Sequence, residues 1–151
     1  MKLSTKSTYG LRAMLNIAME ATGHAVSITD IADREGISIS YLEQLLNTLR
    51  HRGLIESVRG PNGGYILSKD PGEITVREIV EALEGGIYPV HCVTLKSDST
   101  GTCKRNRDCV PKTVWVKLAN AIKECLESIT LKDLCRQANR IDGYKAARRS
   151  V

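Results

Sequence analysis

The sequence is short of aromatic residues and has no long apolar run. Phenylalanine is absent and tryptophan occurs once among 151 residues, so a folded core must be built mainly from aliphatic side chains. The apolar segments are too short for a membrane-spanning helix, which needs about 20 residues. The basic first residues are not followed by an apolar stretch and a small-residue cleavage site, so we expect no signal peptide. These absences favour a cytoplasmic chain.

The cysteines do not have the pattern of a disulfide-stabilised protein. Their number, five, is odd, and clustered thiols in a cytoplasmic chain more often serve metal or redox chemistry. The closely spaced cysteine pairs of zinc sites are also absent, as are a glycine-rich phosphate-binding motif and a catalytic serine, histidine and aspartate arrangement. We therefore expect no enzyme active site.

Positive charge is concentrated in the second half of the chain, which has a net charge of +5 overall. Residues 1–82 contain 9 Lys/Arg and 10 Asp/Glu, whereas residues 83–151 contain 13 and 7. A DNA-binding function in the first half must therefore depend on a few well-placed cations and on helix N-termini.

Apolar spacing predicts three helices at the start of the chain. The first is expected over about residues 5–21, and the second is capped by Ser27 and ended by Gly36. Ser40 and Glu43 form an S-x-x-E capping box that opens the third helix. A link of about three residues that contains glycine is typical of a helix-turn-helix.

A hairpin is expected directly after the third helix, with strands over 54–58 and 65–67 around a glycine-rich turn. A hairpin in this place is a wing. Thr75 and Glu78 then open a fourth helix, which the glycines at 85–86 end. The fold class is therefore mainly α with a small β-wing.

A long helix is expected from about Pro111, because apolar residues recur at steps of three and four, as in a coiled-coil seam. These residues are Trp115, Leu118, Ile122, Cys125 and Ile129. The expected units are a winged helix-turn-helix (1–86), a cysteine-containing loop (87–112), a dimerisation helix region (113–136) and a basic tail (137–151).

Polar side chains gather on the third helix opposite its leucines. Glutamine can form two hydrogen bonds with adenine, glutamate can accept one from cytosine, and serines suit phosphates. Arg59, at the wing turn, could enter a minor groove. The alternative is an ordinary solvated surface. The candidate DNA-binding residues are Ser38, Ser40, Tyr41, Glu43, Gln44, Asn47, Arg59 and Gly60.

The cysteine loop has the spacing Cys92-x10-Cys103-x5-Cys109 and no apolar periodicity. Three thiols in an irregular loop, without a fourth, fit an iron–sulfur cluster that has one non-cysteine ligand. Neighbouring lysines and arginines would offset the charge of an anionic cluster. The alternative is three unligated thiols, which would be prone to oxidation. Cys125 is expected in the apolar seam as a small core residue, and the role of Cys135 stays open.

Several of these segments resemble the Rrf2 family of bacterial winged-helix regulators, and in particular its iron–sulfur cluster regulators. The resemblance covers about residues 1–135 and is carried by segments 1–15, 38–45 and 57–67, by the three loop cysteines and by Trp115. It implies a homodimer that binds promoter DNA, with Cys92, Cys103 and Cys109 as ligands of a [2Fe–2S] cluster. It also implies control of iron–sulfur assembly or stress genes.

The resemblance also implies the roles of individual residues and shows two departures. Glu43 and Gln44 match recognition-helix positions, and Arg59 matches the wing arginine. The gap between the first two cysteines is longer than is usual in the family, and Lys112 stands where iron–sulfur cluster regulators have a histidine. The fourth ligand is therefore open, with His91 as the first candidate.

Other readings remain for the same sequence. Asp108 is a second candidate for the fourth ligand. Nitric-oxide-sensing relatives use an acidic residue near position 8 of the partner chain, and this chain has Thr8 there. The alternatives are a cluster-free Rrf2-type regulator of cysteine or sulfur metabolism, a nitric-oxide sensor and, from a different class, a small iron–sulfur electron carrier. An electron carrier would leave the wing and the polar helix surface without a use.

Overall fold

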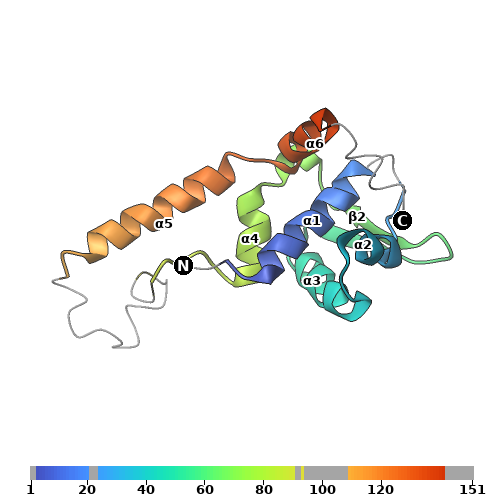
Figure 1. The fold of residues 1–151 in the computed structure, drawn as a ribbon, viewed down its shortest axis with the longest axis horizontal. Coiled ribbons are helices and arrows are strands. Elements are labelled where there is room, and N and C mark those ends of the chain that lie inside the picture. The colour runs from blue at the N-terminus through green and yellow to red at the C-terminus, as the bar shows by residue number, and fades with distance from the viewer. Residues whose placement is uncertain (1–2, 21–23, 91–92, 94–108, 142–151) are drawn as a thin grey trace.

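The computed structural model describes residues 3–20, 24–90, 93 and 109–141. Within these residues the elements are α1 (Thr5–Met19), α2 (Ile28–Glu35), α3 (Ile39–His51), β1 (Ile55–Val58), β2 (Gly64–Leu67), the 3-10 turn η1 (Pro71–Glu73), α4 (Val76–Glu84), α5 (Lys112–Glu127) and α6 (Leu131–Arg140). Figure 1 shows α1 to α4 and the hairpin gathered into a head, from which α5 projects. The predicted mainly-α fold with a small wing is therefore confirmed. None of the helices in the described part is long and apolar enough to cross a membrane.

The helix-turn-helix forms as predicted, except at the start of its second helix. Ser27 caps α2, and Gly36 ends it with a left-handed backbone at φ 63°. The N-cap of α3 is Ser38, whose hydroxyl accepts the N–H of Tyr41 at 3.3 Å. The predicted capping box of Ser40 and Glu43 is wrong, because the chain enters the helix only three residues after α2 and Ser40 already lies in the first turn.

The core of the head is aliphatic. The largest fully buried side chains come from α1 to α4, β1, the segment before α4 and α6, and they are Met14, Ile31, Leu42, Leu46, Leu49, Ile55, Ile74, Ile79 and Leu131. The leucines on one side of α3 are therefore buried in the core, and the opposite side of that helix is left for solvent or a partner.

The predicted seam helix is interrupted after Glu127. Thr130 caps a separate helix, α6, which lies at the top of the head in Figure 1, beyond the end of α5. The link is held to the start of α4, because Val76 N–H donates to Ile129 O at 2.8 Å and Leu131 N–H donates to Ile74 O at 2.9 Å. The prediction that Ile129 lies within the long helix is therefore wrong.

Only part of the predicted seam packs against the head. Ile122 and Leu126 lie against a second apolar cluster that includes Val76 and Val80 of α4. Cys125 is exposed, so its predicted place in the core is wrong. The reason is helical geometry, since successive residues are about 100° apart around the axis and Leu126 takes the inward position.

Candidate DNA-recognition surface

The structure places the predicted recognition residues on one side of α3. Ser38, Ser40, Glu43, Gln44 and Asn47 are exposed, and Tyr41 is partly buried. The first turn of α3 contains no acidic residue, and its last turn contains Arg50 and His51. The unpaired N–H groups at the helix start therefore face a surface without a nearby first-turn carboxylate, which suits an anion such as phosphate.

Tyr41 is held by the first turn of α1. Its ring meets that of Tyr9 edge to face with centroids 6.2 Å apart, and its hydroxyl lies 3.3 Å from Thr5 Oγ1. The start of α1 therefore lies beside the start of α3.

The first turn of α1 is in turn fixed by α4. The Oε1 atom of Glu84 accepts from Ser4 N at 3.0 Å, from Ser4 Oγ at 2.7 Å and from Ser7 Oγ at 2.5 Å. Burial alone would raise the pKa of Glu84, but the hydrogen bonds from Ser7 and Ser4 outweigh it and hold the pKa below its usual value. This carboxylate joins α4 to the helix that supports Tyr41.

Arg50 was not among the residues predicted from the sequence. Its Nη2 donates to Oδ1 of Asn47 at 2.8 Å, and its Nη1 lies 3.5 Å from Oγ of Ser57 on β1. The spacing of Asn47 and Arg50, three residues apart on a helix, was the available signal. The contact to the wing could not be read from the sequence.

The wing is anchored to the segment before α2. β1 and β2 pair antiparallel, with Val58 opposite Gly64. Val26 and Tyr65 exchange two backbone hydrogen bonds of 2.9 Å. A Cβ atom on Gly64 would lie 2.2 Å from Val26 O, so only glycine fits this approach.

Arg59 and Gly60 lie exposed at the free end of this hairpin. Within the described part of the chain, Arg59 takes part in no salt bridge. A cation at the end of an anchored hairpin is available to a negatively charged groove.

The predicted cluster ligands fall largely outside the described residues. Cys92, Cys103 and the candidates His91 and Asp108 lie there. Cys109 has a free, half-buried thiol, and its carbonyl accepts the N–H of Lys112 at 3.1 Å in the turn before α5. The residues that are described contain no group of three metal-ligating side chains. A free thiol at this place fits the soft donor chemistry of a cluster ligand.

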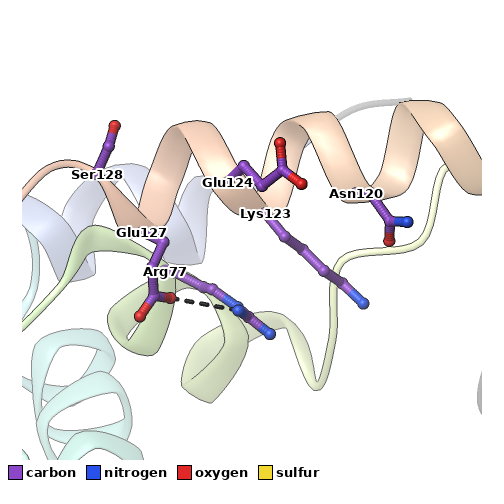
Figure 2. Close-up of a pocket in the computed structure, with 6 residues that line it drawn as sticks. All are labelled: Arg77, Asn120, Lys123, Glu124, Glu127 and Ser128. Atoms are coloured by element: carbon purple, nitrogen blue, oxygen red, sulfur yellow. Dashed lines mark hydrogen bonds and ion pairs between the residues drawn. The ribbon is translucent and has the colours of Figure 1, made fainter.

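An open cleft of about 530 Å³, lined by polar side chains, lies between α5 and Arg77 of α4, and Figure 2 shows these side chains. Arg77 Nη1 lies 3.3 Å from Glu127 Oε2, and Arg77 Nε lies 3.1 Å from Glu81 Oε1. Lys123 lies 5.2 Å from the ring centre of Tyr88. Arg77 of α4 thus contacts carboxylates from both helices, and its ion pair with Glu127 connects α5 to the head.

Comparison with known proteins gives consistent matches over most of the chain. Residues 3–137 match the Rrf2 family, described as iron-dependent transcriptional regulators. The transcriptional regulator IscR of Cronobacter sakazakii is 37% identical over 142 residues, which cover 94% of this chain and 85% of that protein. Among solved structures, IscR of T. potens is 39% identical with a TM-score of 0.74 and coverage of 97% and 96%. CymR, the global cysteine regulator of B. subtilis, is 37% identical with a TM-score of 0.74 and coverage of 91% and 98%.

Proposed function

This chain belongs to the Rrf2 family of transcriptional regulators, and we propose that it reads operator DNA as a cytoplasmic homodimer whose affinity depends on a [2Fe–2S] cluster. It is not an enzyme in this proposal. The observation that carries the DNA-binding part is that the polar side of α3 and Arg59 at the end of the wing are exposed, while Arg50 of α3 reaches Ser57 of the wing at 3.5 Å.

In this proposal α3 enters the major groove. Gln44 and Glu43 face base edges, because an amide can bind adenine in two places and a carboxylate can accept from cytosine. Ser38, Ser40 and Tyr41 lie at the start of α3, where hydroxyl groups and backbone N–H groups suit phosphates. Arg59 reaches the adjacent minor groove, while Gly60 lets the wing approach closely.

A second copy of the chain would cover the exposed apolar residues of α5. Val114, Trp115 and Leu118 are 57%, 38% and 41% exposed, which is unusual for large apolar side chains on one helix. A dimer would present two copies of α3, which then read half-sites about one DNA turn apart.

The cluster would be held by Cys92, Cys103 and Cys109, with His91 as the proposed fourth ligand. When bound, the cluster supplies a centre that can be lost or can change its redox state. Cys109 lies in the turn that opens α5, so ordering this residue also orders the start of the proposed dimer helix. Support comes from the IscR relatives, and control of iron–sulfur biogenesis genes belongs to the same proposal.

The second candidate is a cluster-free regulator of cysteine or sulfur metabolism. The similarity to CymR, described as a global cysteine regulator, favours it, as does Lys112 in place of a histidine. A nitric-oxide sensor is a variant of the first candidate, in which the signal destroys the cluster.

DNA binding is tested by fluorescence anisotropy on duplexes that the wild type selects from a random library. The affinity should fall as the salt concentration rises. Arg59→Ala should reduce the slope of the logarithm of the binding constant against the logarithm of the salt concentration by about 0.9 for each phosphate contact that is lost. Lys132→Ala, which removes an exposed cation from α6, is the matched control and should leave the slope unchanged. A wild type without salt-dependent duplex binding would contradict the DNA-binding proposal.

Cluster binding is tested by anaerobic reconstitution, followed by absorbance and by iron and sulfide analysis. We expect a coloured wild type, loss of the cluster in Cys103→Ala and its retention in Cys125→Ala, since Cys125 is an exposed cysteine of α5. His91→Ala should make the cluster easier to lose. A colourless wild type would favour the cluster-free candidate. Breakdown of the cluster when the loaded protein is exposed to nitric oxide would favour the nitric-oxide sensor.

A further inference from the structure

Asn47 and Arg50 form a side-chain pair on the exposed side of α3. Arg50 Nη2 donates to Asn47 Oδ1 at 2.8 Å, and both residues are exposed. A guanidinium has five N–H donors and no acceptor, so the oxygen of the Asn47 amide, and not its nitrogen, must face it. The pair therefore determines which end of the amide is turned toward Arg50.

The Nδ2 group of Asn47 is then left for an outside partner. An asparagine that can turn freely binds adenine through its oxygen and nitrogen together. In Asn47 one lone pair of the oxygen is taken by Arg50 and the oxygen is turned toward it, so the two N–H donors are the groups best placed to meet a base. Donors in the major groove match N7 and O6 of guanine or O4 of thymine, whereas adenine offers them only N7, beside its own N6 donor. We propose that Arg50 is a positioning residue for DNA reading, which orients the Asn47 amide so that α3 prefers guanine or thymine at the base that Asn47 faces.

Arginine suits this role because it reaches two elements at once. Besides Asn47, its guanidinium lies near the hydroxyl of Ser57 at 3.5 Å, and Ser57 is paired with Tyr65 in the wing. A planar group with several donors can serve two acceptors in fixed directions, which a lysine ammonium does less well. Arg50 is thereby held between the reading helix and the hairpin that carries Arg59.

A phosphate contact is the competing role for an exposed arginine, and salt dependence separates the two. Removing a phosphate contact weakens binding to all sequences alike and lowers the salt slope by about 0.9 for each contact. Removing a positioning residue changes the preference at one base pair and leaves the slope unchanged. The inference rests on the proposed DNA-binding function, but it has its own outcome.

The test compares the wild type with Arg50→Met, Asn47→Ala and the control Arg52→Met. Arg52 is the exposed C-cap residue of α3, two positions after Arg50. Dissociation constants are measured on the selected operator and on duplexes that carry each base at every position of the half-site. We expect the wild type to prefer guanine or thymine at one position by about tenfold. Arg50→Met and Asn47→Ala should both lose that preference at the same position, while Arg52→Met should keep it.

Two further results bear on the proposal. A double variant of Asn47→Ala and Arg50→Met should lose no more base preference than Asn47→Ala alone, because the two residues act as one unit. Arg50→Ala repeats the test of Arg50 with a second substitution. Thermal unfolding checks that each variant is folded.

The proposal is overturned if Arg50→Met keeps the base preference, or if it weakens all duplexes alike with a lower salt slope. Either outcome leaves the proposed DNA binding in place. A wild type that binds no duplex would remove both the proposed function and this inference.

Discussion

Thr75 and Thr130 lie opposite each other in an antiparallel bridge, so that α4 and α6 begin side by side. Each hydroxyl accepts an N–H of its own helix at 3.2 Å, from Glu78 and from Asp133 respectively. The carboxylates of Glu78 and Asp133 complete the two capping boxes by accepting the N–H groups of the threonines. Two helix starts with like dipoles are thus brought together, and each has a carboxylate to offset its positive end.

Thr130→Ala should reduce the free energy of unfolding by about 1 kcal/mol, the usual loss for an N-cap residue. Chemical denaturation measures this value. Thr29→Ala is the control, because Thr29 is an exposed residue in the first turn of α2 and is not its cap. Equal losses in the two variants would show that the α6 cap contributes nothing of its own.

Glu84→Gln should lower stability at neutral pH and lose this effect in acid. The folded pKa of Glu84 is lowered, so its ionised form contributes stability above the unfolded pKa of about 4.3, and that contribution is lost as the pH falls through the folded pKa. Melting temperatures of both proteins from about pH 7 to about pH 3 should therefore converge in acid. Glu73→Gln, at an exposed carboxylate of η1, is the control. A difference that stays constant with pH would contradict this assignment.

Gly64→Ala should destabilise the wing by roughly 2–3 kcal/mol, because the added Cβ would meet the backbone oxygen of Val26, which cannot turn aside. Gly36→Ala is the matched control. Gly36 also has a positive φ, but a Cβ there meets nothing within 4 Å, so it should cost only about 1 kcal/mol. Denaturant titration compares the two, and equal losses would mean that the contact with Val26 is not restrictive.

Leu118→Glu should raise the dissociation constant of the proposed homodimer at least about tenfold, since it replaces an apolar side chain at the expected interface with a charge. Sedimentation equilibrium measures the change. Asn120→Glu adds the same charge to α5 in the cleft that faces α4 and should leave the dimer intact. A monomeric wild type, or equal effects of both substitutions, would contradict the proposed interface.

Local signals in the sequence predicted most of the helix starts and ends in the head. The caps Ser27 and Thr75 and the end of α2 at Gly36 are confirmed, because each depends on residues only a few positions apart. The predicted cap of α3, Ser40, is wrong by two residues, because the position of the cap, Ser38, depends on the length of the turn before it.

The long-range arrangement could not be predicted in the same way. The apolar steps through Ile129 continue across the break after Glu127, because that residue packs against α4 as part of a link and not as part of a helix. The T-x-x-D pattern of Thr130 and Asp133 was the missed local signal for α6. The contact of Arg50 with Ser57 depends on how the wing folds against α3, which spacing alone does not give.

The contacts between α4 and α5 attach α5 to the head near one end of that helix. α5 is attached to the head by its C-terminal half, through Ile122, Leu126 and the Arg77–Glu127 pair, while its 16 residues extend over about 24 Å. A small tilt at the attachment would become a displacement of several ångströms at the far end, next to Cys109. In the proposed dimer, the same tilt would alter the separation of the two reading helices, so the operators most sensitive to the signal should be those with the strictest half-site spacing.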